Sequence, residues 1–183
     1  MTPWGWLLLG LLVVGALTVV LSWTAGRLDR MHIRLATAQA SLDRQLVDRV
    51  ACVRGVATSG VLDPASALVS IDAAEAAHAA VGQADRAGAE STLSAVLRTI
   101  LGDHAAYAEL WQACDEAQRE LLTDLGDACD RVRLAHRFQH DLVDRTAAMR
   151  RRVLVRALHL AGHAPWPTGL TFDDEPPAAL TRR

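Results

Sequence analysis

Two pairs of histidines in the C-terminal half of the chain have the spacing of a metal site. The stretches HRFQH and HLAGH place His136 with His140, and His159 with His163, four residues apart. On a helix this spacing puts both imidazoles on one face, as a pair of metal ligands requires. No glycine or proline separates the two pairs, so we expect them on one helix, with His140 and His159 about 28 Å apart. They therefore cannot form one site. No HExxH or CxxC pattern completes either pair, so exposed or capping histidines are the favoured interpretation and a metal site the alternative.

Arginines are concentrated just after the first histidine pair. The stretch RTAAMRRRVLVR contains Arg145, Arg150, Arg151, Arg152 and Arg156, and Trp166 follows in APWP. A solvated helix face that complements the helix dipole explains such a cluster. If the uncharged residues 4–23 lie in a membrane and the helices of the chain alternate in direction, the cluster instead approaches the membrane surface, where anionic lipid attracts each cation by about 1 kcal/mol. Nucleic acid is not an expected partner, because no aromatic residue interleaves with the arginines and the net charge is −2.

Catalytic motifs are missing from the sequence. The chain has no lysine, which excludes a Walker loop, and it has neither GxSxG nor GxGxxG. The acidic groups of Asp103, Asp173, Asp174 and Glu175 are expected to be loop and tail polarity. We therefore expect a protein that is not an enzyme, with no cofactor and no small-molecule substrate, and keep an anchored enzyme of an unrecognised type as an alternative.

Three cysteines give no disulfide framework. Their number is odd, and Cys114 and Cys129, if they share a helix, lie about 22 Å apart. Free thiols are typical of a reducing compartment.

The N-terminal stretch WGWLLLGLLVVGALTVVLSW predicts a membrane anchor. Residues 4–23 contain no charged side chain, and as a helix they span roughly 30 Å, the thickness of the hydrocarbon core. Trp4, Trp6 and Trp23 stand at the two ends, where indole rings prefer the headgroup level. A cleaved signal peptide has a basic start and a shorter apolar core. We therefore predict a retained transmembrane helix within residues 1–26.

The charges beside this segment predict its orientation. Arg27, Arg30 and Arg34 follow the apolar segment, and no arginine precedes it. The positive-inside rule places the C-terminal side in the cytoplasm. The prediction is a single-pass protein of the cell inner membrane, with its N-terminus outside and its C-terminal domain cytoplasmic.

Helical periodicity continues beyond the anchor. Apolar residues recur every three or four positions, and they predict helices at about 28–62, 64–81, 89–101 and 110–161. Asp63 and Pro64 have the types of an N-cap and a first helical residue. The segment GDHAAYAEL between the third and fourth helices is expected to be a connection.

These elements predict an all-α protein. Residues 27–163 are expected to form an elongated antiparallel helical bundle with coiled-coil-like long helices, because the apolar seams are rich in alanine and the connections are short. Residues 164–183 are Pro-rich and acidic, and we expect a disordered tail there.

The order of these segments resembles the LemA family of bacterial membrane-anchored helical proteins. The resemblance rests on LDRQLVDRVACVRGVA, AESTLSAVLRTI and LLTDLGDACDRVRLAHRFQHDLVDRTAAMRR, and it covers roughly residues 27–157. The matching positions are 45–57, 89–93 and 135–140. The chain departs from the family pattern at Leu46 and Val47, lacks a proline after Asp48, and has His140 where the family has asparagine. The resemblance implies a scaffold or adaptor and no established reaction.

The sequence therefore predicts a membrane-tethered, non-enzymatic scaffold or adaptor that presents a helical surface to a protein partner or to another copy of itself. The alternative is a membrane-associated sensor that binds a metal or anionic lipid through the His- and Arg-rich long helix.

Overall fold

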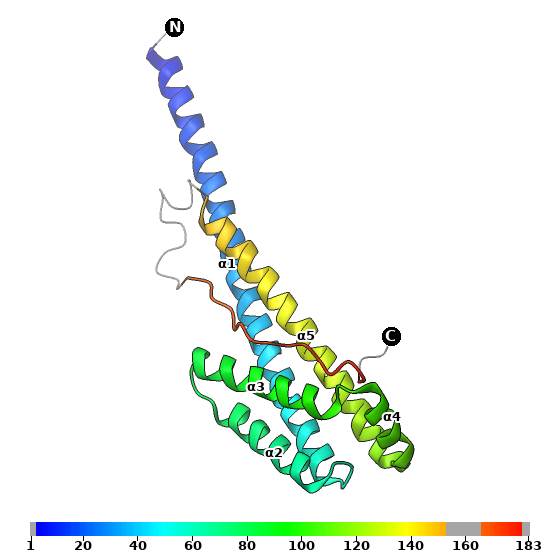
Figure 1. The fold of residues 1–183 in the computed structure, drawn as a ribbon. Helices are drawn as coiled ribbons and strands as arrows, with labels where there is room; N and C mark the ends of the chain where they lie inside the picture. Colours follow the sequence, from blue (N-terminus) through cyan, green and yellow to red (C-terminus); the bar gives the residue numbers. More distant parts are fainter. Residues whose placement is uncertain (1–2, 153–165, 181–183) are drawn as a thin grey trace. The chain divides into compact units, whose positions relative to one another are not determined.

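The computed structural model describes residues 3–152 and 166–180 of the chain, and within these residues it contains five helices and no strand. The helices are α1 (Pro3–Thr58), α2 (Pro64–Ala79), α3 (Gln83–Leu101), α4 (His104–Ala113) and α5 (Glu116–Arg150) (Figure 1). The prediction of an all-helical protein is confirmed.

Helix α1 joins the apolar N-terminal segment to the interior of the protein without a break. Its 56 residues include no proline after the first position. Leu42, Leu46 and Val50, members of the apolar stripe that the sequence showed, are buried. The helix ends at Thr58, and Gly60 follows at φ 77°, a conformation that a residue without a side chain adopts at little cost.

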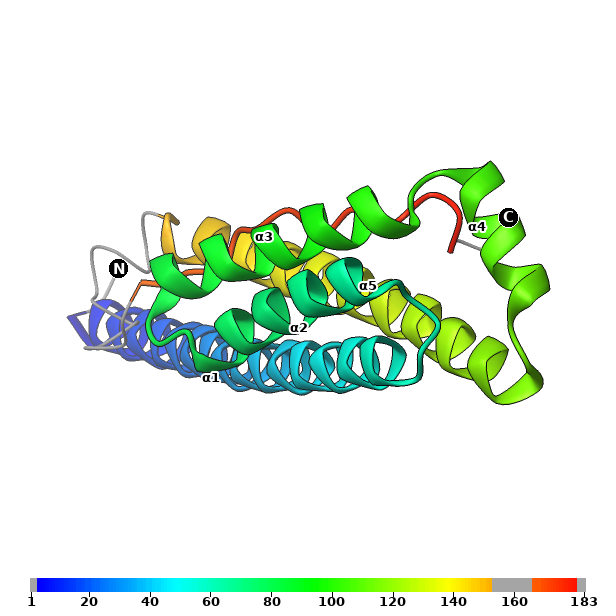
Figure 2. The same cartoon turned by 60° about the horizontal axis from the view of Figure 1, so that its bottom comes forward.

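Helices α2 and α3 form a hairpin and lie side by side (Figure 2). The predicted cap of α2 is confirmed: Asp63 Oδ1 accepts hydrogen bonds from the backbone N–H groups of Ala65 at 3.0 Å and Ser66 at 3.1 Å. Helix α3 begins six residues before its predicted start at residue 89 and ends, as predicted, before Gly102. Its first turn follows Gly82, which has no side chain to signal a cap.

The predicted helix over 110–161 is wrong at its beginning. The structure has two helices there, α4 and α5, and residues 104–109 are helical instead of a connection. Asp103 caps α4 through the N–H groups of Ala105 and Ala106. Asp115 and Gln118 then exchange hydrogen bonds of 2.8 and 3.0 Å, a reciprocal capping box that starts α5. The part of the prediction beyond residue 152 falls outside the described residues until residue 166.

The chain divides into two compact units. Unit 1 contains residues of 1–37 and 140–168, and unit 2 contains residues of 38–139 and 169–183. The main core of unit 2 is built by side chains of α1, α2, α3 and α5, among them Val53, Ala74, Leu93 and Leu125. A second cluster joins Leu42, Leu46 and Val132 to two residues near the C-terminus, Leu170 and Phe172.

One ion pair is enclosed in unit 2. Arg49 of α1 binds the carboxylate of Glu90 on α3, and each side chain is only 2% exposed. Arg49 also donates to Ser94 Oγ at 3.0 Å. Burial raises the pKa of the Glu90 carboxyl, and the charge of Arg49 opposes that rise. The pair therefore fixes α1 against α3 by a contact that requires both partners.

The expected disorder of residues 164–183 is not found in the part that the structure describes. Residues 169–180, here named the C-terminal segment, have no regular helix or strand, yet Leu170, Phe172 and Leu180 are buried. Arg98 of α3 donates to Asp173 Oδ1 at 3.0 Å and to the Glu175 carbonyl oxygen at 2.8 Å. Composition gave the wrong expectation because the few apolar residues of this segment are the ones that enter the core.

Candidate membrane interface

The apolar segment at the start of α1 has the properties of a membrane-spanning helix. By length and composition it is the one described helix that can cross a membrane, and none of the residues in its most apolar stretch is buried within the protein. Trp4 is 75% exposed and Leu11 is 72% exposed. A folded domain rarely leaves so much contiguous apolar surface in water.

The polar groups of the segment are satisfied within the helix itself. Thr18 Oγ1 donates to the Val14 carbonyl oxygen at 2.9 Å, and Thr24 Oγ1 donates to the Val20 carbonyl oxygen at 2.7 Å. A hydroxyl in hydrocarbon has no water to bind, so these intrahelical bonds suit a lipid environment.

Arginines follow where the apolar segment ends. The guanidinium of Arg27 lies 5.8 Å from the ring centre of Trp23, one helical turn before it. Arg30 and Arg34 continue on the next turns of α1. Trp23 and the three arginines, which the sequence predicted as an interfacial boundary, thus follow one another on successive turns of one helix.

The end of α5 lies against the same part of α1. Met149 and Leu28 are buried together, with Met31 packed beside them, in a small cluster of unit 1. Leu28 stands five residues after Trp23, which is about 7.5 Å along the helix. The packing therefore brings the C-terminal end of α5 to the level at which the apolar segment ends (Figure 1).

This contact gathers two groups of arginines that are far apart in the sequence. Residues 24–37 and 145–152 contain seven arginines and one acidic residue, Asp29. Arg145 is already paired with Asp141 at 2.7 Å. We name the other six the arginine collar: Arg27, Arg30, Arg34, Arg150, Arg151 and Arg152.

Trp166 belongs to the same region. Its ring centre lies 5.2 Å from the guanidinium carbon of Arg150, and the side chain is 51% exposed. The predicted lipid contacts Arg150 and Trp166 are therefore neighbours. Arg156, which the sequence placed with them, lies outside the described residues.

His136, the first member of the HRFQH pair, is buried and has partners inside the protein. His136 is 7% exposed, and its Nδ1 lies 2.8 Å from Asp174 Oδ2 while its Nε2 lies 2.9 Å from the Leu170 carbonyl oxygen. Its ring centre is 4.3 Å from that of Phe172. Both ring nitrogens thus face oxygen atoms of the C-terminal segment, and a metal would have to displace these contacts.

The remaining metal candidates gain no support from the geometry. His140 follows His136 by one turn of α5, whereas His159 and His163 lie outside the described residues. Within residues 3–152 and 166–180, no group of three or more His, Cys, Asp or Glu side chains is arranged to hold a metal ion.

The cysteine thiols are held in their protonated form. Burial raises the pKa of Cys129 to about 11, and it also raises the pKa of Cys52 and Cys114. A nucleophilic cysteine needs the opposite shift. The three thiols are free in the structure, as the sequence predicted.

The C-terminal segment is the part of the site that sequence reasoning missed. The acidic run Asp173, Asp174 and Glu175 was expected to be solvated, yet Asp173 binds Arg98 and Asp174 binds His136. The alternation of Leu170 and Phe172 with polar residues was a signal of a segment with one buried face, and it was outweighed by the prolines around it.

No protein-family model, curated protein or solved structure matches this chain. The resemblance to the LemA family stays a prediction.

Proposed function

We propose that this protein is a non-enzymatic, single-pass membrane protein of the bacterial inner membrane, a LemA-like scaffold or adaptor whose cytoplasmic helical domain binds a helical protein partner. The observation that carries the proposal is the exposed apolar segment of α1, which ends at the arginine collar. Because arginine resists translocation, the collar favours a cytoplasmic location for everything that follows residue 26.

The arrangement of unit 2 fits such a role. Gln45 of α1 accepts a hydrogen bond from Arg131 of α5 at 3.1 Å, and the Leu121 side chain of α5 lies at the α carbon of Gly55, where an added Cβ would meet it at 3.4 Å. Gly55 lies ten residues after Gln45 on α1, whereas Leu121 lies ten residues before Arg131 on α5. The two helices therefore run in opposite directions where these residues meet. This pairing supports an antiparallel, coiled-coil-like pair of long helices, which is the elongated scaffold that we propose.

One face of α5 offers a surface for the partner. Leu134 is 56% exposed and Phe138 is 58% exposed, and the two are separated by one helical turn. An i, i+4 pair of large apolar side chains on a helix is the type of anchor that an amphipathic helix of another protein buries.

The topology is tested by protease protection in spheroplasts that express the full chain with a C-terminal epitope. We expect the protein to stay in the membrane pellet after alkaline extraction. The epitope should survive external protease until the membrane is permeabilised. Digestion of the epitope in intact spheroplasts would reverse the proposed orientation, and loss of the protein from the pellet would remove the anchor.

The adaptor role is tested with a photocrosslinking amino acid at position 138 or, as a matched control, at Leu68 of α2, an exposed apolar residue on another helix. We expect one stoichiometric partner to be captured from position 138 and not from position 68. Capture of this protein alone would contradict the adaptor role and indicate a homo-oligomeric membrane protein.

A second function, contact of the collar with anionic lipid, is favoured by the Arg150–Trp166 pair. A cation next to an exposed indole ring suits the headgroup region. A chain that lacks residues 1–26 should bind vesicles of phosphatidylglycerol and not of phosphatidylcholine. Replacement of Arg150, Arg151 and Arg152 by glutamate should abolish that binding, and equal binding to both vesicles would contradict the function.

A further inference from the structure

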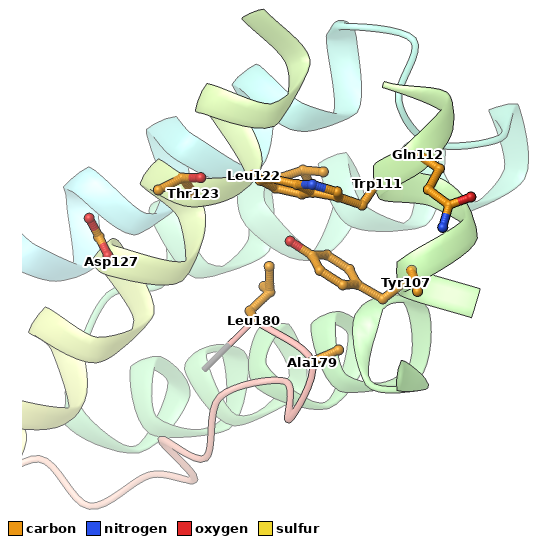
Figure 3. A pocket seen from close by; sticks show the side chains of 9 residues that line it. Tyr107, Trp111, Gln112, Leu122, Thr123, Asp127, Ala179 and Leu180 are labelled. Carbon is orange, nitrogen blue, oxygen red and sulfur yellow. The ribbon is translucent and has the colours of Figure 1, made fainter. Parts of the chain in front are cut away.

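A pocket lies in unit 2 between α4, α5 and the end of the C-terminal segment (Figure 3). Its volume is about 440 Å³, within the range of sites that hold small organic molecules. Tyr107 and Trp111 of α4 form one wall, Leu122 of α5 lies at its base, and Leu180 closes the side formed by the C-terminal segment.

The aromatic wall is held in place without a ligand. The rings of Tyr107 and Trp111 have centres 6.0 Å apart and are tilted by 37°. Arg119 of α5 fixes Trp111, because its Nε donates to the Trp111 carbonyl oxygen at 3.1 Å and its guanidinium lies 5.9 Å from the indole ring. The hydroxyl end of Tyr107 points into the pocket, toward the end at which Thr123 and Asp127 lie (Figure 3).

That end of the pocket carries the carboxylate of Asp127. Asp127 is half-buried, and none of the residues that the structure describes forms a hydrogen bond or an ion pair with it. Thr123, one turn earlier, donates its hydroxyl hydrogen to the Arg119 carbonyl oxygen at 2.9 Å, so its oxygen presents lone pairs. The pocket thus offers two oxygen acceptors at one end.

The surrounding charge has the same sign. Residues 103–130, which include α4 and the first half of α5, contain eight acidic side chains and one arginine. The arginine is Arg119, which is engaged by Trp111. An anion would enter against this field, whereas a cation is attracted by the carboxylates and by the faces of the aromatic rings.

We propose that the pocket binds a small organic amine: a protonated ammonium group on an apolar or aromatic body. The ammonium binds Asp127 and the Thr123 oxygen, and the body lies between Tyr107 and the side chains of Leu122 and Leu180. A wholly apolar ligand would leave the carboxylate of Asp127 desolvated and unpaired, which is costly. This inference goes beyond the proposed scaffold function and does not depend on it.

The test uses the full chain in nanodiscs of neutral phosphatidylcholine and three probes of one shape: 4-phenylbutylamine, 4-phenylbutanol and 4-phenylbutyrate. Isothermal titration should give saturable binding for the amine, at least about tenfold weaker binding for the alcohol, and none for the carboxylate. Equal binding of the amine and the carboxylate, or no saturable binding of the amine, would overturn the proposal.

Variants locate the site. Asp127→Asn should weaken amine binding about tenfold or more, and Tyr107→Leu should weaken all binding. Asp124→Asn, an exposed aspartate one turn from Asp127 that does not line the pocket, is the matched control and should bind as the original chain does. Thermal unfolding followed by circular dichroism establishes that each variant is folded. An Asp127→Asn variant that is folded and binds the amine as tightly as the original chain would exclude the proposed site.

A last variant addresses the arginines that follow Leu180 in the sequence. Arg182 and Arg183 lie outside the described residues, and both are replaced by alanine. Amine binding that is equal or tighter in this variant supports the proposal, and loss of binding would overturn it.

Discussion

Arg49 and Glu90 are charged side chains in the most enclosed part of unit 2, where α1 meets α3. Removing two charges from water costs several kcal/mol per ion, and their attraction offsets that cost only while both are present. The pair is therefore better evidence for a specified contact between two helices than for a large contribution to the free energy of unfolding.

We predict that Arg49→Met lowers the free energy of unfolding by about 3–5 kcal/mol, because Glu90 and Ser94 lose their partner in the interior. The double variant Arg49→Met, Glu90→Met should recover most of this loss. Urea unfolding followed by circular dichroism measures both. Arg145→Met, which breaks the exposed pair with Asp141, is the control and should change the free energy by less than about 1 kcal/mol. A double variant as unstable as the single one would contradict the argument.

The raised pKa of the Cys129 thiol gives a second prediction at the scale of the residue. With a pKa of about 11, only about one in a thousand Cys129 side chains is a thiolate at pH 8. In a variant whose other cysteines are serine, a disulfide reagent should label Cys129 in the folded protein roughly a hundredfold more slowly than in urea. The absorbance of the released thiol follows the reaction, and equal rates would show that Cys129 is accessible.

At the scale of elements, periodicity in the sequence predicted α1, α2 and the end of α3, because each has a continuous apolar stripe and a local stop signal. It failed between α4 and α5, since Leu110 and Cys114 continue the stripe across the break. The capping box of Asp115 and Gln118 was present in the sequence, and it outweighs periodicity because it satisfies backbone groups directly.

The apolar positions of α5 and its buried positions are not the same set. Phe138 has the three- and four-residue spacing of the apolar positions and is exposed, whereas the polar residues His136 and Gln139 are buried. Sequence periodicity assumes that polar residues face water. His136 is buried because the C-terminal segment supplies two oxygen partners for its ring, a contact that no local pattern reveals.

The C-terminal segment gives a prediction for acidic pH. Arg98 holds the pKa of Asp173 below the ordinary aspartate value of about 3.9, so the folded value lies below the unfolded one. The stabilisation by this pair is complete above pH about 4 and is lost as the pH falls through the lower value.

The backbone N–H of Glu175 donates to Asp173 Oδ1 at 3.0 Å, so its NMR chemical shift reports this titration. We expect its midpoint below pH 3.9, and no such titration in Asp173→Asn. A midpoint at or above the ordinary aspartate value would contradict the Arg98 contact.

At the scale of the whole molecule, the apolar segment contributes no buried contact to either unit. We therefore predict that a chain without residues 3–26 remains helical, unfolds cooperatively and, unlike the full chain, is released from the membrane pellet by alkaline extraction. Circular dichroism and fractionation measure these properties. The matched variant without residues 38–58 removes the core residues of α1 and should not fold, because Leu42, Leu46 and Val53 are buried. Collapse of the first variant would show that the segment belongs to the fold.

Only part of the candidate membrane interface could be predicted from the sequence. The apolar segment and the first three arginines are adjacent, so composition alone revealed them. The packing of Met149, which precedes Arg150–Arg152, against Leu28 depends on a contact between residues far apart in the sequence, and the sequence predicted it only as a consequence of an assumed topology. The pocket beside Trp111 was not predicted, because its aromatic wall was assigned in part to a connection.

The place of the C-terminal segment in the chain sets the order in which the protein is completed during synthesis. Leu170 and Phe172 cover Leu42 and Leu46, which leave the ribosome long before them. Folding that proceeds from the N-terminus as the chain emerges therefore cannot close this core until residues 170 and 172 have been made. A ribosome that stalls before residue 170 leaves a chain with an open interior, whose exposed apolar side chains proteases and chaperones recognise.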